Sequence, residues 1–262
     1  AYQHWLKSTE EVKQKDPQAS WKEIHKICGE CPWPQPVGWQ SPFRPNGLHE
    51  TMIRRIAPYS LRGFLYYQGE EDVQRYADYS DMMQMLVKQW RMDWNDWNLP
   101  FLFVQLPMYL ADGEKDDSYW ALQREQQYIA SMMIQNAGMI SLADCGEYDN
   151  IHPLDKKTPG ERLFQLAKNL VYDKQGTITA TAAQLFSDNG KLYVTFDHLH
   201  EKLVMQTANG CPFEISGEDN LFYPAKADVI HGNMLCISNP AVKFPSAVKY
   251  AWYNFGEAAL FT

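Results

Sequence analysis

Short apolar runs alternate with longer amphipathic segments between residues 61 and 172, and this alternation constrains the fold more than any other feature of the chain. The apolar runs predict buried strands over residues 61–67, 99–106 and 139–143. The amphipathic segments have apolar side chains at helical spacing and predict helices over residues 76–94, 119–137 and 159–172. Strands and helices in this order form right-handed βαβ units, so we expect an α/β fold with a mostly parallel sheet flanked by helices.

The segments on either side of this region have different patterns. Residues 1–26 have apolar side chains among charges at helical spacing and predict helical structure, and a proline-rich loop follows over residues 31–45. After residue 172, short segments rich in β-branched and aromatic residues are separated by turn sequences such as Asp188-Asn189-Gly190 and Asn209-Gly210. We therefore expect an α/β domain over residues 1–175 and an all-β sandwich domain over residues 176–262.

The net charge of the chain argues against a nucleic-acid partner, and its hydropathy argues against a membrane span. The chain of 262 residues has 24 Lys and Arg against 32 Asp and Glu, a formal net charge of −8, and no Lys/Arg-rich run. Such a chain repels a phosphate backbone, so we expect no nucleic-acid partner. No stretch approaches the roughly 18 apolar residues that cross a bilayer, so we expect no membrane span.

The cysteines and histidines give little support for a metal site. Cys28 and Cys31 form a C-x-x-C that is compatible with a redox pair or half of a zinc site, but the other three cysteines are scattered. Free thiols or one local disulfide fit this pattern better. Of the seven histidines, only His198 and His200 are close in sequence, and a strand face or loop is the favoured interpretation. We expect neither a metal nor a cofactor.

The sequence Asp149-Asn150-Ile151-His152-Pro153 follows the third predicted strand, and ligands bind at the carboxyl ends of strands in parallel sheets. An aspartate three residues before a histidine can accept a hydrogen bond from imidazole Nδ1, which leaves Nε2 as a base toward a nucleophile. The alternative is a surface loop in which Asp149 caps a turn and His152 is solvated. Position at a strand end makes the two interpretations about equal.

A second polar turn, Gln68-Gly69-Glu70-Glu71-Asp72, follows the first predicted strand. A glycine there lets the backbone approach a ligand and offer an N–H group to a developing oxyanion. Side chains of Gln68, Glu70 and Asp72 would orient the substrate. The alternative is a helix N-terminus whose acidic residues complement the helix dipole, and the sequence does not decide between the two.

A nucleophile is harder to find. The chain contains no G-x-S-x-G, G-D-S or G-Q-S-N sequence. Ser41 and Ser60 lie in or beside proline-containing loops, and Ser141 lies inside an apolar run. Cys145 is close to the Asp-His sequence and is a possible thiol nucleophile, although a small packing role is favoured for it.

Taken in order, the motifs resemble those of the sialate O-acetylesterase family of SGNH-type carbohydrate esterases. The resemblance is carried by PNGLHETMI at residues 45–53, IAPYSLRG at 56–63, YYQGE at 66–70, WR at 90–91, LPF at 99–101, VQL at 104–106 and DNIHP at 149–153. The β segment resembles the C-terminal domain of the family at FEISG, residues 213–217, and PSAVKYAW, residues 245–252.

The resemblance implies hydrolysis of an acetyl ester on a sugar, such as O-acetylated sialic acid, by a serine nucleophile. His152 would be the general base, Asp149 would orient it, and Gly69 would line the oxyanion hole. Asp72 stands where many members of the family have Asn, and a carboxylate donates a hydrogen bond only when protonated. The family often works outside the cytoplasm, which favours a periplasmic or secreted location.

In the family, the serine lies in a Gly-Gln-Ser-Asn-like turn upstream of the Tyr-Gln-Gly-Glu turn, and this segment is not among the 262 residues. We therefore expect the C-terminal portion of such an esterase, completed by the upstream segment as a separate chain or by self-association. A catalytically inactive carbohydrate-binding or interaction protein on the same fold is the main alternative. A glycosidase that uses Glu70 and Asp149 comes third.

Overall fold

The computed structural model describes residues 1–32, 44–57, 59–206 and 212–262. The described chain divides into two compact units, Ala1–Tyr59 and Ser60–Thr262. Most of the predicted proline-rich loop, together with Ser41, Cys211 and the turn Asn209-Gly210, lies outside the described residues. The predicted domain boundary near residue 175 falls within the second unit and stays a prediction.

The first unit contains short helices. Residues 1–26, predicted to be helical, fall in two helices, α1 (Tyr2–Lys15) and α2 (Trp21–Cys28), because Pro17 forces the preceding Asp16 into an extended conformation. Ser20 then starts α2 through a capping box with Glu23. A π-helical turn, η1 (His49–Ile53), runs into α3 (Arg54–Ile56).

The second unit begins with the parallel sheet that the alternating pattern predicted. Strands β1 (Phe64–Tyr66), β2 (Phe101–Val104) and β3 (Ala137–Ile140) pair in that order, and both pairings are parallel. The helices between and after them are η2 (Glu70–Asp78), α4 (Tyr79–Asp93), α5 (Tyr119–Met133) and α6 (Lys157–Leu170). The helix predicted to end at 137 stops earlier, since Asn136 has a left-handed φ of 51° and β3 starts directly after it.

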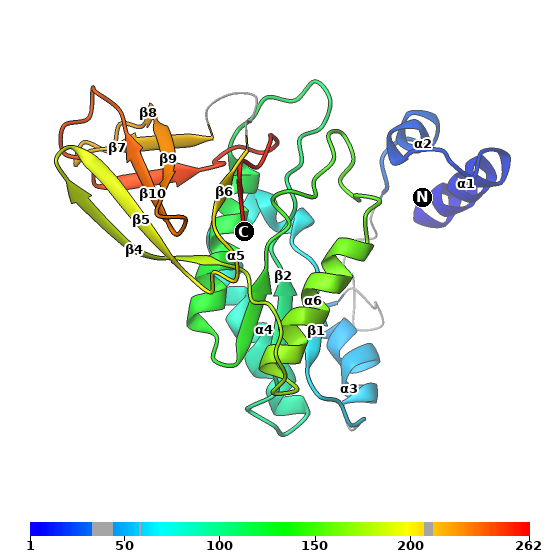
Figure 1. The fold of residues 1–262 in the computed structure, drawn as a ribbon. Helices are drawn as coiled ribbons and strands as arrows, with labels where there is room; N and C mark the ends of the chain where they lie inside the picture. The colour runs from blue at the N-terminus through cyan, green and yellow to red at the C-terminus, as the bar shows by residue number, and fades with distance from the viewer. Residues whose placement is uncertain (33–43, 58, 207–211) are drawn as a thin grey trace. The chain divides into compact units, whose positions relative to one another are not determined.

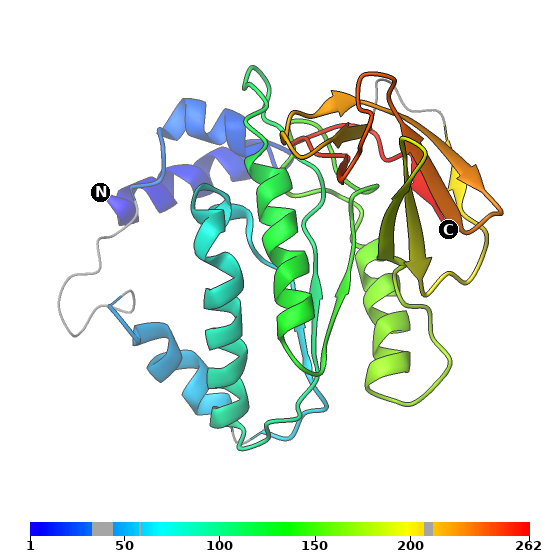
Figure 2. The same ribbon diagram turned by 90° about the vertical axis from the view of Figure 1, so that its left-hand side faces the viewer.

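Helices cover both faces of the parallel sheet (Figures 1 and 2), and alternate residues of the central strand pack against opposite layers. Phe101 and Phe103 pack against α4 and α5, whereas Leu102 and Val104 pack against α6 with Leu166. All four strand residues are at most 1% exposed. A parallel sheet covered on both faces explains why its strands are continuous apolar runs in the sequence.

The C-terminal part of the second unit consists of antiparallel sheets, as predicted. One has the order β4-β5-β10-β9 and contains β4 (Thr181–Asp188), β5 (Lys191–Asp197), β9 (Lys226–Ile230) and β10 (Met234–Ser238). The second contains β11 (Ala247–Tyr250), β7 (Phe213–Ser216) and β8 (Tyr223–Pro224), and a two-stranded pair contains β6 (Val204–Met205) and β12 (Leu260–Phe261). The two larger sheets share one core that includes Val194, Ile215 and Ile237. The predicted α/β fold class with an added β region is thus confirmed, although β8 and β12 were not predicted.

Asn254 and Arg124 join the end of the chain to the α/β part of the same unit. The Asn254 side chain accepts from the backbone N–H of Trp120 at 3.0 Å and donates to Asp117 at 2.8 Å. Arg124 on α5 donates to the carbonyl groups of Ala251 and Tyr253. Both residues are at most 7% exposed, and the bonds to Trp120 and Ala251 are fully buried. Within the described ranges, the helices are too short or too polar to cross a membrane.

Candidate active site

The turn after β1 is held by the side chains of its own residues. Gln68 Nε2 donates to Asp72 Oδ2 at 2.7 Å, and Tyr66 Oη donates to Gln68 Oε1 at 2.9 Å. The other carboxylate oxygen of Asp72 accepts from Arg75 at 3.2 Å. Asp72 therefore accepts hydrogen bonds on both oxygens, and it shapes the turn that carries Gly69 and Glu70.

Gly69 occupies a position that no other residue fits without strain. Its φ is 145°, and a Cβ atom there would lie 3.0 Å from Gln123 Nε2 and 3.1 Å from Gln127 Nε2. Both glutamines are 0% exposed and belong to α5. The backbone at this strand end is thus packed directly on two buried amides, which is the close approach that a glycine permits. Glu70 then begins η2.

The loop after β3 carries the predicted Asp-His pair and is fixed from within by Glu147. The Glu147 carboxylate accepts from the Asn150 side chain and from the backbone N–H of Leu154, each at 2.7 Å. The Asn150 side-chain oxygen accepts from the backbone N–H of His152 at 3.1 Å. Neither Glu147 nor Asn150 was singled out from the sequence, since a glutamate and an asparagine in a loop carry no signal of such contacts.

Asp149 ties the same loop to the segment after β2. Its backbone N–H donates to the Leu110 carbonyl at 3.0 Å, and its Oδ1 accepts from the backbone N–H of Asp112 at 2.8 Å. Gly146 lies so close to Met108 that a Cβ atom would overlap the Met108 carbonyl group. Asp149 and the imidazole of His152 are exposed on this anchored loop, and a bond between them stays a prediction.

The two candidate loops meet at one apolar cluster. Tyr67, beside the Gly69 turn, and Ile151, inside the Asp-His loop, both pack on Val73, Leu106 and Trp120. This cluster lies where β1 and β2 end, the edge at which parallel sheets bind ligands. The structure therefore brings the Gly69 turn and the Asp149–His152 loop to the same edge.

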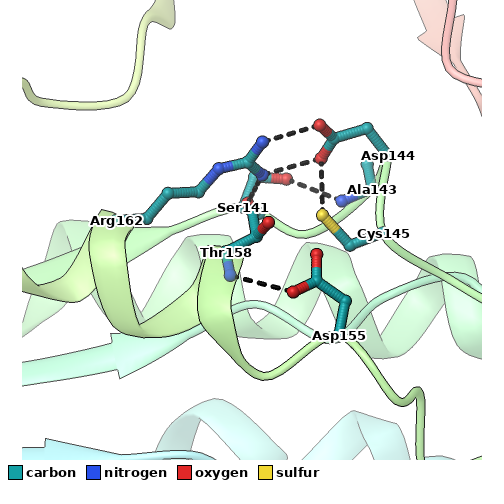
Figure 3. A network of polar contacts seen from close by, with 7 residues as sticks. All are labelled: Ser141, Ala143, Asp144, Cys145, Asp155, Thr158 and Arg162. Atoms are coloured by element: carbon teal, nitrogen blue, oxygen red, sulfur yellow. Dashed lines mark hydrogen bonds and ion pairs between the residues drawn. The ribbon is translucent and has the colours of Figure 1, made fainter.

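An ion pair between Asp144 and Arg162 fixes the start of the Asp-His loop (Figure 3). The two nitrogens of the Arg162 guanidinium donate to the two oxygens of Asp144 at 2.7 and 2.6 Å, and one also donates to the Ser141 carbonyl. Burial acts to raise the pKa of Asp144, but Arg162 outweighs it and holds that pKa below its ordinary value. At the other end of the loop, Asp155 accepts from the first N–H groups of α6.

Cys145 is poorly suited to act as a nucleophile. Burial raises the pKa of its thiol to about 11, and the neighbouring Asp144 carboxylate adds to the shift. The Cys145 side chain packs on the core beside α6 and its Sγ contacts Asp144 Oδ1 at 3.4 Å. A thiol with this pKa stays protonated at neutral pH and lacks the thiolate that attacks an ester.

Of the serines named from the sequence, Ser60 and Ser141 lie among the described residues, and neither has an arrangement typical of a nucleophile. Ser60 is exposed. Ser141 Oγ accepts from the backbone N–H of Ala143 at 3.3 Å directly after β3, which is a local turn contact.

His198 and His200 lie between β5 and β6, with His231, around a hollow of about 580 Å³. His200 Nε2 accepts from the backbone N–H of Ile178 at 3.3 Å, which is a structural contact. In the part of the chain that the structure describes, no three His, Cys, Asp or Glu side chains are arranged to hold a metal ion.

Comparison with known proteins identifies the class of protein that this fold and site belong to. Residues 36–169, just over half of the chain, match the family "Carbohydrate esterase, sialic acid-specific acetylesterase". The chain therefore belongs to this carbohydrate esterase family, and the resemblance found in its motifs is confirmed.

Individual relatives agree with this assignment. The sialate O-acetylesterase of Mus musculus is 27% identical over 236 residues, which are 80% of this chain and 43% of the mouse protein. That of Homo sapiens is 25% identical over 248 residues, 86% of this chain and 46% of the human protein. A crystal structure of a carbohydrate acetylesterase from Xanthomonas citri superposes with a TM-score of 0.74 at 32% identity, over 82% of this chain and 50% of that one. The chain thus spans half the length of these relatives or less.

Proposed function

We propose that this chain carries the Asp-His and oxyanion parts of the active site of a carbohydrate O-acetylesterase that releases acetate from O-acetylated sialic acid. One observation carries the proposal. The Gly69 turn and the Asp149–His152 loop meet at one edge of a parallel sheet, where they pack around Tyr67, Leu106 and Ile151. Membership of the esterase family and the names of the relatives supply the substrate class.

In the proposed reaction, a serine hydroxyl attacks the acetyl carbonyl and His152 takes its proton. Asp149 orients the imidazole and stabilises the imidazolium. The Gly69 N–H stabilises the oxyanion of the tetrahedral intermediate. Collapse breaks the bond to the sugar oxygen, which takes the proton from His152 and leaves as a hydroxyl, and an acetyl-enzyme remains. Water activated by His152 then releases acetate and regenerates the serine.

We further propose that the serine comes from a segment outside these 262 residues, supplied upstream, by a separate chain or by a second copy. The edge strand β1 supports this. Its Leu65 pairs in register with Leu102, which lies under α6 and is 1% exposed, yet Leu65 itself is 66% exposed. An apolar side chain exposed on an edge strand favours a further strand or covering segment there.

Acetate release from an O-acetylated sialic acid tests the proposal. We would compare this chain, its His152→Ala variant, and this chain supplied with the upstream segment of its gene. We expect release only when the segment and His152 are both present. Release by the chain alone would contradict an external serine. Binding of the acetylated sugar without release by any sample would contradict the esterase proposal and favour the non-catalytic carbohydrate-binding protein.

A further inference from the structure

The carbonyl group of Gln68 joins the Gly69 turn to two of the helices that pack against it. Tyr79 Oη, from the start of α4, donates to this carbonyl at 3.0 Å. Gln127 Nε2, from α5, donates to the same oxygen at 3.3 Å. Both donors are at most 3% exposed. Two buried donors from two different helices thus hold one backbone oxygen.

The orientation of each donor is itself determined. Gln127 Oε1 accepts from the backbone N–H of Leu106 at 2.8 Å, so the amide nitrogen of Gln127 faces the carbonyl groups of Gln68 and Val104. Burial raises the pKa of Tyr79, so its hydroxyl keeps its proton and remains a donor. Neither side chain can turn away without leaving a buried polar group unsatisfied.

Holding this carbonyl also sets the direction of the next N–H group. The carbonyl of Gln68 and the N–H of Gly69 belong to one planar trans peptide, in which they point in opposite directions. Because Tyr79 and Gln127 draw the oxygen toward α4 and α5, the Gly69 N–H is directed away from these helices. Gly69 has no side chain, so the peptide lies directly on the amides of Gln123 and Gln127.

We propose that Tyr79 and Gln127 are positioning residues that aim the Gly69 N–H at the oxyanion of the ester hydrolysis. The proposal rests on the function proposed above, because the oxyanion exists only in that reaction. Neither residue touches the substrate. Their role is to keep the peptide from rotating, so that the donor is in place before charge develops.

The test uses the form of the protein that releases acetate, with Tyr79→Phe, Gln127→Glu and the matched control Tyr250→Phe. Tyr250 is a half-buried tyrosine of the β region whose hydroxyl accepts from the backbone N–H groups of Ala259 and Leu260. We expect Tyr79→Phe to lower kcat about ten-fold with KM nearly unchanged, because a misaimed donor weakens transition-state binding alone. Tyr250→Phe is expected to lower thermal stability but not kcat.

Gln127→Glu adds a signature that a purely structural role does not produce. A protonated glutamic acid donates to the Gln68 carbonyl and an ionised one does not. We therefore expect kcat of this variant to be close to that of the unmodified protein at low pH and to fall as the carboxyl ionises. A kcat that matches the unmodified protein at every pH in both site variants would overturn the proposal, as would an equal kcat loss in Tyr250→Phe.

A crystal structure of the Tyr79→Phe, Gln127→Glu double variant separates this proposal from the proposed function. We expect the Gln68–Gly69 peptide to rotate in the double variant, whether or not the protein releases acetate. An unrotated peptide would overturn the positioning role even in an active esterase. Absence of acetate release from the unmodified protein would overturn the proposed function, and the peptide orientation would still show whether Tyr79 and Gln127 hold the Gln68–Gly69 peptide.

Discussion

At the residue scale, the thiol of Cys145 and the imidazole of His152 lie on the same loop but in different environments. Cys145 packs on the core and has a pKa raised to about 11, whereas the His152 side chain is exposed. A protonated thiol against apolar side chains behaves as a small hydrophobic group. Its position next to an Asp-His pair is therefore not sufficient to assign it a chemical role.

This difference predicts that Cys145→Ala keeps the proposed esterase activity. We expect kcat within about two-fold of the unmodified protein, together with a loss of stability of about 1 kcal/mol from the smaller side chain. Acetate release and thermal unfolding of the same sample measure both. A fall in kcat as large as that caused by His152→Ala would identify Cys145 as the nucleophile and contradict the account.

At the scale of elements, α6 anchors both ends of the loop after β3. Arg162 binds Asp144 at one end, and the N-terminus of α6 binds Asp155 at the other. The ion pair has a definite pH dependence, since the Asp144 pKa is lower in the folded chain than its ordinary value of about 3.9. Its stabilisation is complete above that ordinary value and is lost as the pH falls through the folded pKa.

We predict that Arg162→Met lowers the free energy of unfolding by about 1–2 kcal/mol at pH 7, because the bidentate ion pair with Asp144 is lost. The deficit should shrink as the pH falls below about 4, because Asp144 is then protonated in the unfolded chain and, at still lower pH, in the folded chain as well. Urea unfolding at several pH values measures this. The matched control is Arg54→Met, which removes an exposed i,i+4 pair with Glu50 and is expected to cost little at any pH. A deficit independent of pH would contradict the role of Asp144.

The elements of the parallel sheet were predictable because the central strand is buried on both faces and each helix packs one apolar face against the sheet. The order of apolar residues in the sequence therefore follows the burial of each element, as in the continuous apolar run that forms β2. Two of the shortest strands show no such pattern in the sequence. Strands β8 and β12 have two residues each and depend on pairing with β7 and β6.

The candidate site was predictable only where its residues are neighbours in sequence. The Gly69 turn and the Asp149–His152 loop each form one short motif after a strand. The contacts of Gln127 with Gln68 and of Arg124 with Ala251 join residues 59 and 127 positions apart. No local periodicity carries information about such contacts, so Tyr79, Gln127 and Glu147 emerged only from the structure.

At the scale of the whole molecule, α5 connects three parts of the second unit. Gln127 holds the turn after β1, the N-terminus of α5 binds Asn254, and Arg124 binds the segment that follows β11. The end of the chain is thereby hydrogen-bonded to the helix that supports the proposed oxyanion donor. The β region is thus attached to the esterase fold by buried polar contacts.

The proposed reaction requires that His152, Asp149 and Gly69 serve a serine nucleophile supplied from outside these 262 residues. Acid quenching of the active protein during turnover of an O-acetylated sialic acid, followed by peptide mass spectrometry, locates the acetyl-enzyme directly. We expect one acetyl group on a serine of the upstream segment, and none in a His152→Ala sample. An acetyl group on Cys145, or on any residue of the 262, would contradict it.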